Sequence, residues 1–360
     1  MKVLALIDHP GHVCYRYRIE AFAAALFDRG MELETVALQQ GRVPRVLRLP
    51  RAARADVVVL QRRLLPAWQL GVLRRFAKRL VYDVDDAVFQ RSSRHADPTS
   101  VRRMKRFRAT VRLADVVVAG NEYLRQRAEV VAGGGRAVTV PTTVSPGRYR
   151  LARHERRGAA ARLVWIGSAS TLRGLEMAGT HFAAIGQRLD GVELRIVSDR
   201  TASFDGVRTT LRRWSQAGEA AELADGDIGV SWLADDSWSR GKCGLKVLQY
   251  MAAGLPVVAN RVGANCEMVV DGVTGLLVDT PEQWAEATAR LAYDPGLRGR
   301  MGAAGRRMVE ERYSVETWGP RFAGLLKGIA EDRPVDQAWR AAEPVALDSR
   351  PKGDLVPTDQ

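Results

Sequence analysis

The chain has 360 residues, of which 46% are hydrophobic and 27% are charged. At about 100–200 residues per domain, this length predicts two domains, and the apolar content excludes a globally disordered chain. No run approaches the ~18 apolar residues of a membrane-spanning helix, and the first apolar run ends at Asp8, too early for a signal peptide. Three widely spaced cysteines, Cys14, Cys243 and Cys266, indicate neither a disulfide framework nor a metal site. We therefore expect a cytoplasmic protein.

The net charge of +14 is concentrated in one stretch of the sequence. Between Arg42 and Arg112, nineteen Lys or Arg residues stand against five Asp, which accounts for the whole surplus. Such a stretch favours an anionic partner, either lipid headgroups, a phosphorylated acceptor or nucleic acid. Nucleic acid is the weaker option because no Cys/His finger or other nucleic-acid module accompanies the charge. The alternative is an Arg-rich protein whose helix faces are simply solvated.

In the first half of the chain, short apolar runs alternate with helical stretches such as 15–29. The runs are continuous rather than alternating, which is typical of parallel strands buried on both faces, with helices as right-handed crossovers. They lie at 3–7, 33–38, 56–60, 79–84, 115–120 and 137–141.

A Gly-, Pro- and Arg-rich stretch at 142–161 predicts a linker, and a second series of apolar runs follows it. These runs lie at 163–167, 193–198, 227–233, 255–260 and 274–279. We predict an α/β fold with two doubly wound domains that face each other across a cleft, where the ligand binds at strand carboxyl ends. The predicted boundaries are 1–150 for the first domain, 161–313 for the second, 314–330 for a helix that packs back towards the first, and 331–360 for a disordered tail.

The segment Gly241–Val278 is the most informative in the chain. It predicts a glycine-bearing loop, a helix from about 245 to 253, a turn and a buried strand. Free backbone N–H groups at the start of that helix, together with Lys242 and Lys246, fit a diphosphate. The alternative is an ordinary helix–strand unit with two surface lysines.

Within this segment, Tyr250–Ala259 and Val262–Val278 resemble the donor-binding signature of glycosyltransferase family 4, the glycosyl transferases group 1. The resemblance is strong in the second half of the chain and weak in the first. It implies the GT-B fold, with two Rossmann-like domains. It also implies retaining sugar transfer from a UDP- or GDP-sugar, without a required cofactor or metal.

The resemblance also assigns the donor-side residues. The family usually has two glutamates at the positions of Gly241 and Gln249, and an arginine and a lysine at those of Ser168 and Arg173. Gln249 still has an amide for a ribose hydroxyl, whereas Gly241 has no side chain. Arg173 and Lys246 are the expected catalytic groups on the leaving diphosphate. The predicted donor site comprises Gly167, Ser168, Arg173, Lys242, Gly244, Leu245, Lys246, Gln249 and Glu267.

In the first half, Asp83, Asp85 and Asp86 follow a buried strand. Three carboxylates so close repel one another unless they are paired or bind a metal. Asp83-Val84-Asp85 also has the DXD pattern of metal-dependent GT-A enzymes, but the second half argues against that fold. We expect Asp85 or Asp86 to orient or deprotonate the acceptor hydroxyl; the alternative is a cluster paired with arginines.

The first strand-to-helix turn adds acceptor-side candidates. Gly11 permits close backbone approach, His12 can bind substrate or phosphate, and Arg16 and Arg18 suit an anionic acceptor. The alternative for a loop histidine is a surface residue without a role.

The leading hypothesis is a glycosyltransferase in polysaccharide, glycolipid or other glycoconjugate synthesis; its acceptor is unidentified, and a lipid-linked molecule is one option. A peripheral position at the inner face of the cell membrane is plausible for it. One alternative is a non-catalytic nucleotide- or glycan-binding protein, motivated by the missing glutamates. The other is an anionic-membrane or nucleic-acid binder that uses the basic stretch 42–112.

Overall fold

The computed structural model describes residues 1–39, 44–93, 95 and 97–342. The chain forms two compact units, and neither is continuous in sequence. The first contains Met1–Thr143, Asp235–Cys243 and the described residues from Val315 onwards; the second contains Val144–Ala234 and Gly244–Ser314. No helix in the described part of the chain is both long and apolar enough to cross a bilayer.

The first unit is built on a six-stranded, wholly parallel sheet with the order β2-β1-β3-β4-β5-β6. Its Val- and Leu-rich inner strands are buried on both faces, as a doubly wound sheet requires, whereas the edge strand β2 is partly exposed. The strands are β1 (Lys2–Ile7), β2 (Glu32–Ala37), β3 (Val57–Gln61), β4 (Leu80–Val84), β5 (Val116–Ala119) and β6 (Ala137–Thr139).

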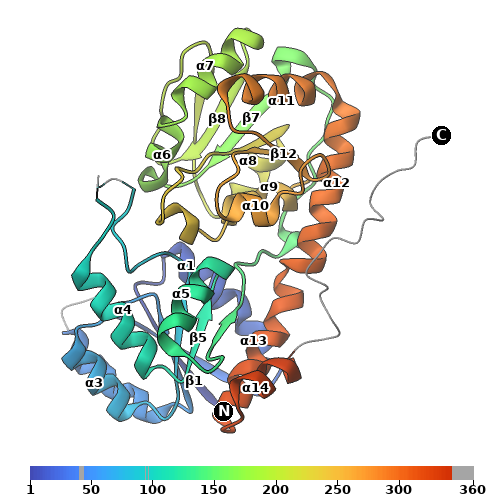
Figure 1. Cartoon of the computed structure of the whole chain (residues 1–360). Helices are drawn as coiled ribbons and strands as arrows, with labels where there is room; N and C mark the ends of the chain where they lie inside the picture. Colours follow the sequence, from blue (N-terminus) through green and yellow to red (C-terminus); the bar gives the residue numbers. More distant parts are fainter. Residues whose placement is uncertain (40–43, 94, 96, 343–360) are drawn as a thin grey trace. The chain divides into compact units, whose positions relative to one another are not determined.

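Helices cover both faces of this sheet (Figure 1). One face packs against the helical segments η2 (Arg45–Arg54), α3 (Ala67–Phe76), α4 (Val101–Leu113) and α5 (Glu122–Ala132). The other face packs against α1 (Val13–Arg18), η1 (Glu20–Phe22), α2 (Ala23–Phe27) and α13 (Val315–Ala330). The helix predicted at 15–29 is therefore three short pieces, because the backbone leaves helical geometry at Ile19.

Residues after Val315 complete the first unit. The ring of Phe322 on α13 lies 5.0 Å from that of Phe22. The helix α14 (Val335–Ala342) packs on α13, where Trp339 stacks on Trp318 and Ala338 is buried against Gly328. The predicted disorder is therefore wrong for 335–342, because one small apolar helix face finds a partner; positions 343–360 lie outside the described residues.

The second unit has a second six-stranded parallel sheet, ordered β12-β11-β10-β7-β8-β9. Its strands are β7 (Arg162–Ile166), β8 (Glu193–Ser198), β9 (Arg208–Arg213), β10 (Ile228–Ser231), β11 (Val257–Ala259) and β12 (Gly275–Leu277). Its helices are α6 (Ala169–Glu176), α7 (Gly179–Arg188), α8 (Glu219–Ala224), α9 (Leu245–Ala252), α10 (Ala264–Met268), α11 (Pro281–Tyr293) and α12 (Pro295–Arg312). The sequence analysis missed β9 because this edge strand is largely polar.

The strand order of each sheet reverses once, between β1 and β3 in the first unit and between β7 and β10 in the second. In doubly wound sheets, ligands bind at the carboxyl ends of the strands beside this reversal. We therefore expect functional side chains at the carboxyl ends of the strands beside each reversal.

Candidate functional site

The turn from β7 to α6 lies at the strand reversal of the second unit. Trp165 is buried, and a Cβ on Gly167 would lie 2.5 Å from its ring and 2.6 Å from the Thr171 hydroxyl. Glycine is therefore the only residue that fits this turn without a rearrangement. The Ile166 N–H donates to the Tyr250 hydroxyl at 3.0 Å, and that hydroxyl donates to the Val230 carbonyl at 3.2 Å. These bonds tie α9 to the ends of β7 and β10.

The first turn of α9 lies beside the β7–α6 turn. Gly244 precedes α9 with a φ of 61°, and a Cβ there would lie 2.3 Å from the Met268 sulfur. Gly244 has no side chain to cap the helix, and the N–H groups of Val247 and Leu248 donate to its carbonyl at 2.9 and 3.2 Å. The N–H of Leu245, for which no hydrogen bond is recorded in the described part of the chain, is therefore a candidate donor for an anion. The Lys246 ammonium lies 4.3 Å from the Trp165 ring centroid. The helix α10, which packs against Gly244, carries the exposed Glu267.

Arg173 lies on α6 and Ser168 precedes that helix, at the same strand edge. Arg173 is exposed, and no hydrogen bond or ion pair is recorded for it within the described ranges. Ser168 shares a hydrogen bond with Ser170 at 2.7 Å. The Ala169 N–H already donates to Asp199 at 2.8 Å, and such backbone N–H bonds lower the pKa of Asp199. The start of α9 is therefore a better anion-binding position than the start of α6.

A buried amide network that the sequence analysis missed fixes this edge. Asn265 donates to the Ser231 carbonyl at 3.3 Å and to the Asn260 carbonyl at 3.1 Å. Asn260 in turn accepts from the Leu233 N–H at 2.9 Å. The two asparagines hold the ends of β10 and β11 together; the Asn-X4-Asn spacing was the available signal.

Gln249 points into the second unit. It is 4% exposed, and its amide donates to the Tyr149 hydroxyl at 3.4 Å. That hydroxyl donates to Glu219 at 3.0 Å, and Glu219 also accepts from the Trp214 ring N–H at 3.0 Å. The structure thus buries the side chain that the sequence analysis placed on a donor ribose.

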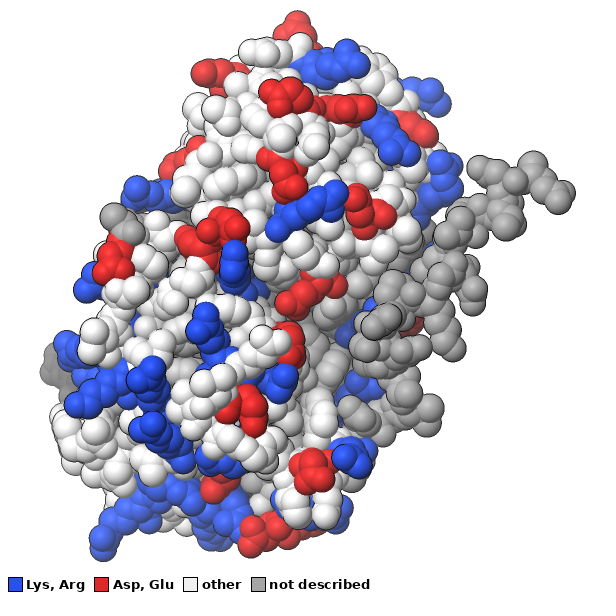
Figure 2. Space-filling view, in the orientation of Figure 1, with Lys and Arg blue, Asp and Glu red and all other residues white. Residues whose placement is uncertain are grey.

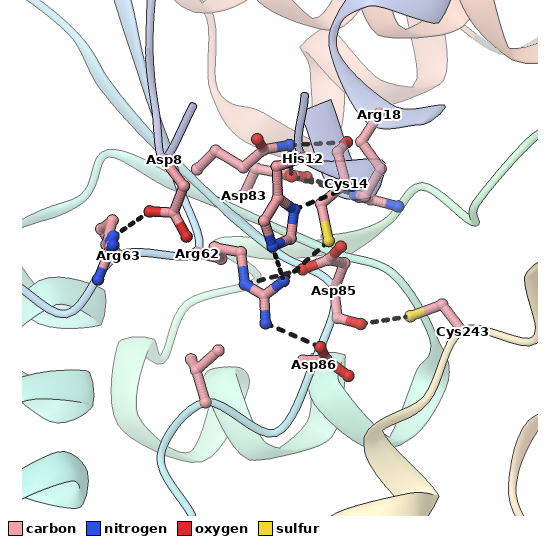
Figure 3. Close-up of polar contacts among 12 residues, drawn as sticks. Asp8, His12, Cys14, Arg18, Arg62, Arg63, Asp83, Asp85, Asp86 and Cys243 are labelled. Atoms are coloured by element: carbon pink, nitrogen blue, oxygen red, sulfur yellow. Dashed lines mark hydrogen bonds and ion pairs between the residues drawn. The ribbon is translucent and has the colours of Figure 1, made fainter. Parts of the chain in front are cut away.

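In the first unit, the carboxylates at the carboxyl end of β4 are paired with arginines (Figure 3). Arg18 donates to both oxygens of Asp83 at 2.6–3.1 Å and to the Val140 carbonyl at 2.8 Å. Since Arg18 is 2% exposed and Asp83 is 1% exposed, this pair is internal. The prediction that Arg18 contacts an acceptor is therefore wrong: its donors are used to join α1 to β4 and β6.

Arg62 is the centre of the remaining cluster (Figure 3), and sequence reasoning did not identify it. It follows β3 with a φ of 46°, a strained backbone for a non-glycine residue. It donates to Asp86 at 2.8 Å and to the Cys14 sulfur at 2.9 Å, and lies 3.8 Å from Asp85. Burial alone would raise the pKa of Asp85, but Arg62 and Arg18 hold it below its ordinary value. Asp85 therefore stays ionised, which suits orientation and electrostatics better than proton abstraction.

His12 and its neighbours occupy the same edge. The His12 ring caps α1, with Nδ1 accepting from the Cys14 N–H at 3.2 Å and Nε2 lying 3.3 Å from Arg62. Burial, followed by the charge of Arg62, lowers the pKa of His12, so the ring is neutral near pH 7. Gly11 is exposed in the preceding turn, and Arg16 stacks over the Tyr17 ring at 4.5 Å.

The segment Asp235–Cys243 belongs to the first unit and reaches the same cluster. Lys242 lies 3.0 Å from Asp86 and over the Trp238 ring, while Cys243 donates to the Asp85 carbonyl at 3.1 Å. Asn121 caps α5 and donates to the Lys242 carbonyl at 3.0 Å. The sequence analysis grouped Lys242 with Lys246; the structure instead pairs Lys242 with a carboxylate of the first unit, because the chain passes from one unit to the other after Cys243.

Gly241 fits its position because it has no side chain. A Cβ there would lie 2.7 Å from both the backbone nitrogen and the Cβ of Ala87. The missing side chain at this position is therefore a packing requirement of the first unit.

Comparison with known proteins finds sequence similarity that includes most of the second unit. Residues 160–294 match the family of glycosyl transferases group 1. The GDP-mannose-dependent alpha-(1-6)-phosphatidylinositol monomannoside mannosyltransferase of Mycobacterium tuberculosis is 28% identical over 243 residues, covering 59% of this chain and 62% of that protein. The D-inositol 3-phosphate glycosyltransferase of Kribbella flavida is 49% identical over 84 residues, covering 23% of this chain and 20% of that protein. These matches span less than two thirds of the length of the curated relatives.

Two solved structures share the fold over nearly the whole chain. HepE of Anabaena, in complex with UDP and glucose, has a TM-score of 0.64 at 18% identity and covers 91% of this chain and 100% of that one. Sucrose-phosphate synthase of Thermosynechococcus elongatus has a TM-score of 0.69 at 17% identity, and the match covers 92% of this chain and 100% of that one. The predicted pair of Rossmann-like sheets, the GT-B fold, is confirmed.

Proposed function

We propose that this chain, whose residues 160–294 match the family of glycosyl transferases group 1, transfers a sugar from a nucleotide-diphosphate sugar to a hydroxyl acceptor. The observation that carries the proposal is the packing of the α9 start, with Lys246, beside the glycine turn between β7 and α6. The start of α9, which has no side-chain cap, lies at this strand edge with Lys246 and the exposed Arg173, and these groups have the chemistry that a diphosphate needs.

In this proposal, the second unit binds the donor. Lys246 and the first N–H groups of α9 hold the diphosphate, and Arg173 neutralises the charge that develops as the sugar bond breaks. We infer a retaining, metal-independent reaction, in which the departing diphosphate accepts the proton of the acceptor hydroxyl. UDP and GDP are the nucleotides we favour, since HepE binds UDP and the mycobacterial relative uses GDP-mannose.

We assign the acceptor side to the carboxyl end of β4 in the first unit. Asp86 carries the two cationic partners Arg62 and Lys242, and the lowered pKa of Asp85 keeps a second negative charge beside it. Asp85 and Asp86 would thus orient an acceptor hydroxyl rather than remove its proton. The named relatives act on a phosphatidylinositol mannoside and on an inositol phosphate, so a phosphorylated or lipid-linked polyol is the acceptor class we favour.

A non-catalytic nucleotide-binding protein is the second candidate. Two observations favour it: Gly241 has no room for a side chain, and Gln249 is buried. Such a protein would bind the nucleotide sugar at the same strand edge and release it unchanged.

A turnover assay separates the two candidates. The full chain is incubated with UDP-glucose or GDP-mannose, with and without D-inositol 3-phosphate or phosphatidylinositol, and release of the nucleoside diphosphate is followed. We expect acceptor-dependent release, and at least a tenfold loss in Arg173→Ala, roughly 1.4 kcal/mol of transition-state stabilisation. Arg188→Ala, an exposed arginine on α7, is the matched control. Donor binding without any release would favour the non-catalytic candidate.

A further inference from the structure

One helical face of the first unit is strongly cationic. The segments η2, α3 and α4 lie side by side on one side of the sheet. Together they carry twelve Lys or Arg residues and no Asp or Glu. Figure 2 shows the blue side chains gathered over this part of the molecule, at the lower left.

Much of this charge is uncompensated. Arg74 pairs with Asp115, and Arg103 donates to backbone carbonyls. In contrast, the exposed residues Arg102, Lys105 and Arg108 of α4 have no recorded hydrogen bond or ion pair within the described part of the chain. Burial, followed by the like charges of Arg102 and Arg45, lowers the pKa of Arg106. These charges repel one another, and an anionic surface would relieve the repulsion.

The same face also exposes apolar groups. A groove of about 640 Å³ lies along α4, with Phe89, Val101, Met104 and Ala109 among its apolar lining and with Lys105 and Arg108 also lining it. Val101 is 86% exposed. Farther along the face, Trp68 on α3 is 60% exposed and Leu47 on η2 is 66% exposed. Apolar side chains set among cations match a surface with phosphates outside and hydrocarbon beneath.

We propose that this face, formed by η2, α3 and α4, docks on an anionic phospholipid bilayer. Arg102, Lys105 and Arg108 contact the headgroup phosphates, and the groove along α4 receives apolar groups of the interface. A nucleic-acid duplex would satisfy the charges but would gain nothing from the groove or from the exposed Val101 and Trp68. The proposal goes beyond sugar transfer and does not depend on it.

Vesicle sedimentation with the full chain tests the docking. The probes are phosphatidylcholine vesicles, the same vesicles with about a third phosphatidylglycerol, and a 20-base-pair DNA duplex, each at low and high salt. We expect binding to the anionic vesicles alone, with a loss at high salt because the contacts are electrostatic. Lys105→Gln/Arg108→Gln should bind at least tenfold more weakly, and Val101→Ser should also bind more weakly.

The control is Arg188→Gln/Arg290→Gln, which removes two exposed charges from the second unit. It should bind anionic vesicles as the unaltered protein does, and all variants should melt at the same temperature. Equal binding to neutral vesicles, preference for the DNA duplex, or an unchanged affinity in Lys105→Gln/Arg108→Gln would overturn the proposal.

Discussion

Arg18 and Asp83 form an ion pair inside the first unit, where water cannot screen the charges. Removing one partner leaves the other charged and buried, which costs roughly 3–5 kcal/mol. We expect Asp83→Asn to lower the free energy of unfolding by about this amount, as measured by urea denaturation. Glu32→Gln, which breaks an exposed pair with Lys2, should cost at most about 1 kcal/mol. Similar losses in the two variants would contradict the assigned internal role.

Gly241 makes a second prediction at the residue scale. A Cβ at this position would lie too close to Ala87, so Gly241→Ala should lower the unfolding free energy by about 1–3 kcal/mol through overpacking. Gly71→Ala is the control, because Gly71 lies in α3 with no atom within 4 Å of its ideal Cβ. That variant should gain up to about 1 kcal/mol of helix stability. A harmless Gly241→Ala would show that the loop has room for a side chain.

His12 gives a pH dependence. The pKa of His12 is lowered in the folded state. Below about pH 6.5 the ring therefore binds a proton in the unfolded chain more readily than in the folded one. The stabilisation that depends on a neutral His12 ring is complete above that pH and is lost as the pH falls below it. We expect the melting temperature of His12→Asn to fall less between pH 7.5 and 5.5 than that of the unaltered protein, since Asn keeps the helix cap. Parallel pH profiles would rule His12 out.

At the scale of elements, every strand was predictable except the polar edge strand β9. Continuous Val- and Leu-rich runs located eleven of the twelve strands, because strands buried on both faces need such runs. The edge strand β9 was not predicted because its stability comes from pairing with β8, including an ion pair between Arg208 and Glu193. The helix α14 was also not predicted, because its stability comes from an apolar contact with its partner α13.

The candidate site was predictable where backbone geometry dictates the residue. Gly167 and Gly244 are required by close packing, and both were recognised as landmarks of the donor site. Side-chain partners were not predictable, because they depend on which unit holds each segment. Lys242 and Lys246 are four residues apart, yet one pairs with Asp86 and the other lies over Trp165. No sequence motif marks Arg62, and only the fold places it beside the carboxylates of Asp85 and Asp86 and the ring of His12.

At the scale of the whole molecule, the described part of the chain crosses between the two units four times. The first unit is completed by α13, whose Trp318, Phe322 and Leu326 join the core formed with Ile19 and Phe22. A fragment of residues 1–143 would expose that apolar face. We expect it to be unfolded or aggregated by circular dichroism and sedimentation. The same fragment joined through a flexible linker to residues 315–342 should recover cooperative melting; a folded fragment 1–143 would contradict this dependence.

The central claim is that the second unit holds a nucleotide diphosphate at the α9 start and the β7–α6 turn. Its most direct test is calorimetric binding of UDP and GDP to the full chain and to Arg173→Ala, Lys246→Ala and Lys242→Ala. We predict binding of one nucleotide, with a loss of at least tenfold in the first two variants. Lys242→Ala should retain binding, because that lysine pairs with Asp86 in the first unit. No binding of either nucleotide, or a loss confined to Lys242→Ala, would contradict the account.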